Sequence, residues 1–224
     1  MYKRQRLQRS EENLKSWIKY RSDIWRYDGA EEPLRRMANT NSNLYAYRFD
    51  WDEQNNSSFA GNYQLFVGAA HGLEIPFLTG DFDLGPITFY IKPFMFPDDS
   101  DEGRLALSDL MMTYWANIAK YGNPNEFVKG PKWEKFTQEN NQLLILDNPT
   151  ANLVEMRTIP VSKDDLLSQI EADSALEIKE RCLIGWIAAR NFQEDARPQP
   201  PFNFCSNFTE EDLYKLRNLT EGRD

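Results

Sequence analysis

The sequence has few of the residues on which disulfide-rich domains and metal centres depend. Among its 224 residues there are two cysteines, Cys182 and Cys205, and a single histidine, His71. Two cysteines are too few for a disulfide framework, and their spacing is not that of a zinc site. We therefore interpret them as reduced thiols, with a single disulfide bond as the alternative.

Long apolar runs are also absent. Residues 1–6 carry the positive charge of a signal n-region, but no apolar run follows them. No stretch of the sequence is long and apolar enough to span a bilayer. The sequence predicts neither a secretory signal nor a membrane span, which favours a cytoplasmic location.

Positive charge is scarce as well, and the formal net charge is −9. A nucleic-acid partner is therefore excluded, because phosphate binding needs a basic face. Apolar residues make up 41% of the chain and aromatic residues 13%, which is enough to build a core and argues against disorder.

Hydrophobic periodicity and turn residues predict helices that flank a few strands. The first predicted elements are a helix over 10–28 with Leu14, Trp17, Ile18 and Arg21 on one face, a helix over 31–41, a strand over 43–50 and a loop over 52–62. An irregular apolar segment over 65–80, a long helix over 100–122, strands over 142–147 and 153–158, and three final helices follow. This order indicates the α/β class. Three strands make a small sheet for so many helices, so we expect part of the sheet to be missing from the chain.

The final helices are expected to begin at capping boxes. In these boxes Ser162 pairs with Asp165, Ser174 with Glu177, and Thr209 with Asp212. A proline-rich stretch over residues 197–201 is predicted to form a stiff linker before the last helix.

The long helix over residues 100–122 has the clearest pattern. Asp101 and Glu102 suit its N-terminus, Gly122 suits a left-handed C-terminal position, and Pro124 prevents its continuation. Its apolar stripe is predicted to pack in the core and consists of Leu107, Leu110, Met111, Tyr114, Trp115 and Ile118.

His71 is the candidate for chemistry, because histidine transfers protons near neutral pH. Gly68 and Gly72 lie on either side of it and permit a sharp backbone turn, and Glu74 can hydrogen-bond within the loop. We expect His71 on a loop at the C-terminal end of the strand that contains Tyr45 to Phe49, the edge at which open α/β sheets place ligands. The alternative is a structural core histidine.

The segment around His71 resembles the catalytic-histidine loop of type-B carboxylesterases and cholinesterases. That loop reads Gly-x-x-His-Gly-x-Glu-Ile and continues through a Phe-rich stretch to a glycine. The matching positions are Gly68, His71, Gly72, Glu74, Ile75, Phe77 and Gly80.

The surroundings are similar to the same family. Residues 44–50 resemble the strand before the histidine loop, and residues 111–125 resemble a long helix that ends in Gly-(Asp/Asn)-Pro-Asn. The resemblance covers roughly residues 20–160 and is closest to bacterial members. It implies that residues 1–224 are the C-terminal portion of a single α/β-hydrolase domain with an incomplete sheet, and that residues 195–224 are a peripheral helical tail.

In this family a serine attacks the ester carbonyl, the histidine acts as general base and then general acid, and a Glu or Asp orients the histidine. The nucleophile, the acid and the histidine follow one another along the chain in that order. The sequence contains no Gly-x-Ser-x-Gly motif, no recognisable acid loop and no Gly-rich oxyanion loop. The resemblance therefore implies that His71 is the one triad residue of this chain, that a small-molecule ester is the substrate, and that no metal or organic cofactor takes part.

The sequence also allows a second interpretation of the function. Some members of the family are non-catalytic and work by protein adhesion, and such members commonly lose a triad residue. A truncated, inactive fragment is a further alternative. An upstream Gly-x-Ser-x-Gly motif would favour the enzyme, and its replacement would favour the binding protein.

Overall fold

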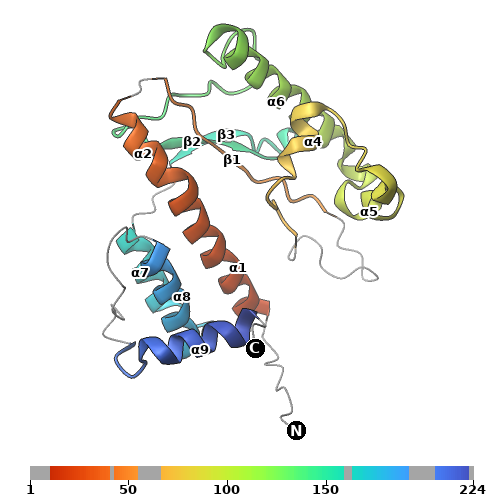
Figure 1. The fold of residues 1–224 in the computed structure, drawn as a ribbon. Helices are drawn as coiled ribbons and strands as arrows, with labels where there is room; N and C mark the ends of the chain where they lie inside the picture. Colours follow the sequence, from red (N-terminus) through yellow and green to blue (C-terminus); the bar gives the residue numbers. More distant parts are fainter. Residues whose placement is uncertain (1–10, 41–42, 55–66, 159–162, 192–204, 222–224) are drawn as a thin grey trace. The chain divides into compact units, whose positions relative to one another are not determined.

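A computed structural model describes residues 11–40, 43–54, 67–158, 163–191 and 205–221 (Figure 1). The chain divides into two compact units. One unit combines Met1–Pro33 with Pro160–Asp224, and we call it the terminal unit; the other is Leu34–Ile159, the central unit. The central unit contains His71 and the sheet.

The sheet of the central unit has three strands in the order β1-β2-β3. They are β1 (Tyr47–Phe49), β2 (Gln142–Leu146) and β3 (Glu155–Thr158). β1 pairs with β2 in parallel, with Tyr47 opposite Leu144, and β2 pairs with β3 antiparallel. The predicted strands over 142–147 and 153–158 are confirmed, whereas the predicted strand over 43–50 shortens to the three residues of β1.

The helices of the central unit lie mainly between β1 and β2 in the chain. They are α4 (Glu74–Thr79), α5 (Thr88–Met95) and α6 (Asp101–Tyr121), and α2 (Glu32–Ala38) begins at the boundary with the other unit. The sequence predicted α6 well: the helix ends at Gly122, which has a φ of 67°. α4 was not predicted as a helix. Its six residues are too few to show a helical hydrophobic period, and they directly follow the turn over residues 71–73.

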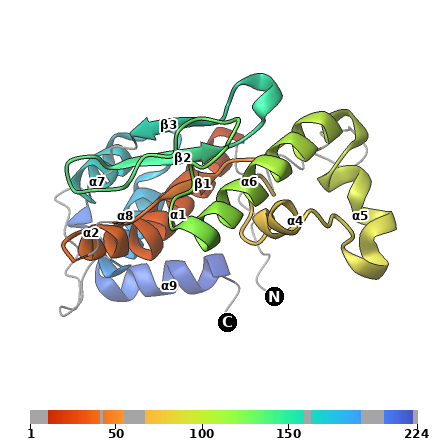
Figure 2. The same ribbon diagram turned by 90° about the horizontal axis from the view of Figure 1, so that it is seen from above.

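The core of the central unit lies between the sheet and α4 and α6, which run side by side (Figure 2). Leu144 and Leu146 of β2 point into it, and Trp133 donates its indole N–H to the carbonyl of Ala46 at 2.9 Å. The predicted stripe of α6 is partly right. Leu107, Met111 and Tyr114 are fully buried, while Leu110, Trp115 and Ile118 are only partly buried against the same cluster.

The terminal unit is helical within its described residues. Its helices are α1 (Glu11–Arg26), α7 (Lys163–Ala172), α8 (Ile178–Asn191) and α9 (Glu210–Glu221), and a π-helical turn, Tyr27–Glu31, follows α1 (Figure 1). The separate second helix predicted over 31–41 is therefore shorter and continues the helical path of the first.

The buried face of α1 differs from the prediction. The buried residues are Asn13, Trp17, Tyr20 and Ile24, whereas Ile18 and Arg21 are exposed. The cause is polar: the buried Glu180 carboxylate of α8 accepts hydrogen bonds from Asn13 Nδ2 at 2.7 Å and from Trp17 Nε1 at 3.1 Å. A purely hydrophobic pattern cannot anticipate a buried asparagine that satisfies a buried carboxylate.

Cys182 and Cys205 form a disulfide bond, so their interpretation as reduced thiols is wrong. Cys182 lies in α8, and Cys205 lies in the segment before α9. Both are buried, and their Cα atoms are 5.6 Å apart although 23 residues separate them in the sequence. Sequence spacing does not reveal such proximity, because it arises from the packing of α9 on α8.

The capping predictions have different outcomes. Thr209 and Asp212 form the predicted reciprocal box, with the Thr209 hydroxyl accepting from the Asp212 N–H at 3.2 Å. The box assigned to Ser174 is wrong, because α8 begins at Ile178 and Glu180 accepts instead from the N–H of Glu177 at 3.0 Å. Ser10, Ser162, the linker over 197–201 and most of the loop over 52–62 lie outside the described residues.

The described residues are thus mostly helical, with a small three-stranded sheet. This composition is compatible with a partial α/β-hydrolase domain. None of the helices in the described ranges has both the length and the apolar character needed to cross a membrane.

Candidate functional site

His71 lies in a turn over residues 71–73 that leads into α4, as predicted, and its side chain is exposed. Exposure contradicts the alternative of a core histidine. Gly68 and Gly72 have φ values of 51° and 90°, in the left-handed region that favours glycine. A Cβ atom added to Gly72 would meet no atom within 4 Å, so its backbone conformation, not the available space, requires glycine.

Hydrogen bonds close the turn on both sides of His71. The N–H of Leu73 donates to the carbonyl of Ala70 at 3.1 Å, and the N–H of Gly72 donates to Glu74 Oε2 at 2.9 Å. On the other side, Gln54 Nε2 donates to the carbonyl of Gly68 at 2.9 Å. Since Gln54 comes shortly after β1, this bond places the turn beyond the C-terminal end of that strand.

Phe77 of α4 anchors the segment that carries His71. Its side chain is 0% exposed, and its ring lies 5.2 Å from the ring of Phe49, the last residue of β1, and 5.2 Å from that of Trp51, two residues further on. Its carbonyl accepts a hydrogen bond from the buried hydroxyl of Ser108 in α6 at 2.8 Å. α4 is therefore fixed to the sheet and to the long helix together.

Tyr47 of β1 lies near the same turn. Burial raises the pKa of Tyr47, and the carboxylate of Glu74 adds to that increase. The Tyr47 ring also packs edge-on against Trp115 at 5.0 Å.

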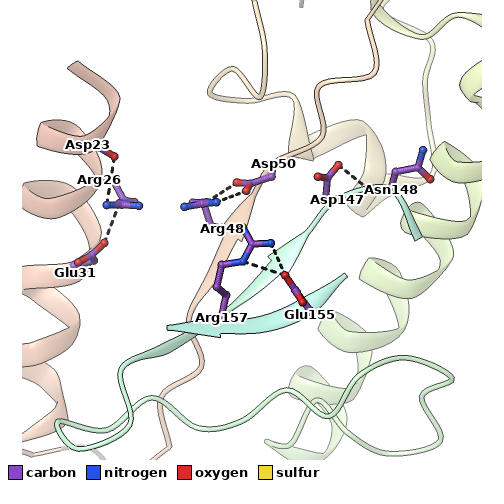
Figure 3. A network of polar contacts seen from close by, with 9 residues as sticks. All are labelled: Asp23, Arg26, Glu31, Arg48, Asp50, Asp147, Asn148, Glu155 and Arg157. Atoms are coloured by element: carbon purple, nitrogen blue, oxygen red, sulfur yellow. Dashed lines mark hydrogen bonds and ion pairs between the residues drawn. The ribbon is translucent and has the colours of Figure 1, made fainter. Parts of the chain in front are cut away.

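Carboxylates gather where β1 and β2 end. Figure 3 shows Asp50 just past β1, paired with Arg48, and Asp147 just past β2, accepting from the N–H of Asn148 at 2.7 Å. Asn148 in turn donates to Glu53 Oε1 at 2.9 Å. The pKa of Asp147 is raised to about 6, chiefly by burial. The N–H of Asn148 lowers it, and the nearby carboxylates of Asp52, Asp50 and Glu53 raise it.

Replacing Asp147 with Asn is expected to stabilise the central unit at neutral pH but not near pH 4. An unfolded aspartate ionises near pH 4. Because the folded pKa is raised to about 6, the proton that Asp147 holds stabilises the fold below pH 4, and this contribution is lost as the pH rises through 6. Asparagine cannot ionise, so the gain should level off above pH 7 at about 1–2 kcal/mol after allowance for solvent screening.

Urea unfolding of both proteins at pH 4, 6 and 8 measures this effect. Asp109→Asn removes the same charge from an exposed position of α6 and controls for net charge. An equal stability difference at all three pH values would contradict the assignment.

The sequence predicted His71 and the hydrogen bond of Glu74 within the loop, which is confirmed, and it missed Gln54 and Asp147. His71 was identified from its glycines. The sequence around Gln54 does not indicate that its side-chain amide hydrogen-bonds to the carbonyl of Gly68. Asp147 directly follows the buried strand β2, and this position could have identified it as a candidate site residue. Within the described ranges, no group of three or more His, Cys, Asp or Glu residues could hold a metal ion.

Comparison with known proteins connects this arrangement to one family. Residues 1–163 match the model of the carboxylesterase family. The chain is 32% identical over 103 residues to acetylcholinesterase of Gallus gallus, a match that covers 46% of this chain and 11% of that protein. It is 40% identical over 68 residues to neuroligin-3 of Macaca mulatta, covering 30% of each. Neuroligin-3 of Homo sapiens matches at the same identity over 7% of its length.

These matches span less than a third of each relative named. All three relatives are vertebrate proteins, so the predicted likeness to bacterial members has no support among them. The family match itself covers well over half of the chain, and it includes β1, the turn with His71 and α6. The chain therefore belongs to the carboxylesterase family.

Proposed function

We propose that the chain is the C-terminal part of a type-B carboxylesterase domain with the α/β-hydrolase fold, and that it supplies the histidine of a Ser-His-Glu/Asp triad. Both units would belong to that one domain, with residues 195–224 as its peripheral tail. The observation that carries the proposal is the exposed His71 on a two-glycine turn beyond the C-terminal end of β1.

In the proposed reaction, the substrate is an uncharged or weakly charged carboxylic ester. The imidazole of His71 accepts the proton of a serine hydroxyl as the oxygen attacks the ester carbonyl, and later donates that proton to the leaving alcohol. The serine, the orienting acid and the oxyanion hole would come from residues outside this sequence. No metal or organic cofactor is needed for this chemistry.

Four carboxylates, Asp50, Asp52, Glu53 and Asp147, follow the ends of β1 and β2. We do not assign any of them as the triad acid, since in α/β-hydrolases that residue precedes the histidine in a loop of its own.

The experiment is ester hydrolysis by the complete protein. His71→Gln should lower kcat by on the order of 10⁴-fold or more, because loss of the base disables the triad as a unit. Gln138→Ala, at an exposed position of the central unit, is the control and should retain full activity. Equal turnover of His71→Gln and the wild-type protein would refute a catalytic role for His71.

The second candidate is a non-catalytic, protein-interaction member of the family. The 40% identity to neuroligin-3 supports this candidate, and the match to acetylcholinesterase supports the enzyme. It predicts that a complete protein with an intact His71 turn has no esterase activity, and that the upstream Gly-x-Ser-x-Gly motif is replaced. The same assay therefore separates the two candidates.

A further inference from the structure

We propose that Gln54 and Glu74 are positioning residues that hold the backbone on the two sides of His71. The inference rests on the proposed function, in which His71 transfers a proton. Gln54 binds the turn at Gly68, three residues before the histidine, and Glu74 binds it at Gly72, one residue after.

Gln54 is a buried side chain with one specific bond to the turn. Its exposed fraction is 5%, and its Nε2 donates to the Gly68 carbonyl at 2.9 Å. Its Oε1 is buried without a hydrogen-bond donor from the described part of the chain. A buried carbonyl oxygen without a donor costs free energy that an apolar side chain of the same size would avoid. The bond to Gly68 is therefore what an amide contributes at this position.

Glu74 secures the other side. It is the first residue of α4, and its Oε2 accepts from the N–H of Gly72 at 2.9 Å. A carboxylate is favourable in the first turn of a helix, where backbone N–H groups lack partners within the helix. Because Gly72 has a φ of 90°, the bond from Glu74 holds a backbone conformation that few other residues could adopt.

The two bonds matter because the side chain of His71 is exposed. The backbone of the turn sets the place and direction from which the imidazole extends, so the two bonds bear directly on its position. Proton transfer to and from a bound substrate needs heavy-atom distances near hydrogen-bond length, and small displacements reduce the rate strongly. Gln54 and Glu74 thus act through His71 without contact with the substrate.

Hydrogen exchange and NMR of the 224-residue chain test the inference directly. Because His71 is the only histidine, its imidazole gives a single set of signals that needs no assignment among others. Gln54→Met keeps the volume and removes the donor, while Glu74→Ala removes the acceptor. Each should raise the exchange rate of the Gly72 and Leu73 amides at least tenfold and broaden the imidazole signals.

Rescue and matched controls separate positioning from general damage. Glu74→Gln retains an acceptor oxygen and should restore most of the protection. Gln138→Met and Glu139→Ala change the same residue types in the segment over residues 137–141, where Gln138 binds Asn39 and Glu139 binds the Thr137 hydroxyl. These controls should leave the turn unchanged, and protected β2 amides in every variant would show that the sheet is intact.

If Gln54→Met and Glu74→Ala leave the hydrogen-exchange protection of the turn unchanged, the inference is overturned. This holds whether or not the complete protein hydrolyses esters. If the turn loosens, the complete protein should lose kcat at least tenfold in both variants with little change in KM, and Glu74→Gln should recover it. Loosening of the turn with wild-type kcat would also overturn the positioning role. If the complete wild-type protein has no esterase activity, the proposed function is refuted. The hydrogen-exchange result alone then decides whether Gln54 and Glu74 hold the turn.

Discussion

Replacing Phe77 with alanine is expected to lower the free energy of unfolding of the central unit by about 3–5 kcal/mol, the usual range for a fully buried phenylalanine. The Phe77 side chain is 0% exposed and is surrounded by four aromatic rings, those of Phe49, Trp51, Phe82 and Phe96. Truncation would leave a cavity between α4 and the end of β1, and rigid rings cannot collapse into it easily.

Urea unfolding followed by tryptophan fluorescence measures this loss, because the central unit contains Trp51, Trp115 and Trp133. Phe127→Ala is the control, since the Phe127 side chain is 90% exposed and its truncation should change stability by less than about 0.5 kcal/mol. A loss below about 1 kcal/mol for Phe77→Ala would mean that α4 is not anchored as described.

Removing the disulfide bond is expected to cost the terminal unit about 3 kcal/mol. The Cys182–Cys205 bond closes a loop of 23 residues, and loop closure of this length restricts the unfolded chain by about that free energy. The bond also attaches the segment before α9 to α8. Beyond it, α9 meets α8 through the edge-to-face pair of Trp186 and Tyr214, whose ring centroids are 4.9 Å apart.

Amide hydrogen exchange of the Cys182→Ala/Cys205→Ala double variant provides the measurement. Protection in α9 should fall most, because the bond attaches the segment just before this helix to α8, while protection in β2 should stay constant. Treatment of the wild-type chain with dithiothreitol should reproduce the pattern without a change of sequence. Full protection of α9 in the reduced chain would contradict the expected role of the bond.

Local signals in the sequence predicted the parts of the fold that local interactions decide. α6 was predicted because acidic residues, a broad apolar stripe, Gly122 and Pro124 all indicate the same boundaries. The Thr209 box was predicted because its two partners are three residues apart. The turn around His71 belongs to this class as well, since its left-handed positions are glycines.

The parts that the sequence did not predict depend on tertiary contacts. The buried face of α1 is set by Glu180, more than 160 residues away in the chain. The disulfide bond depends on the packing of α9, and Gln54 binds Gly68, which is 14 residues away in the chain. Trp115 was predicted to be buried with its stripe, yet it is only partly covered because it lies at the margin of the core cluster.

The most direct test of the central claim is an esterase assay of residues 1–224 by themselves. We expect no hydrolysis of p-nitrophenyl acetate above the buffer rate, and no difference between the wild-type chain and His71→Ala. The sequence has no Gly-x-Ser-x-Gly motif and no Gly-rich oxyanion loop, so the residual catalysis that survives loss of a triad residue should be missing too. Turnover that depends on His71 and is abolished by a serine-directed organophosphate would reveal a nucleophile within the chain and contradict the claim that the histidine is its only triad residue.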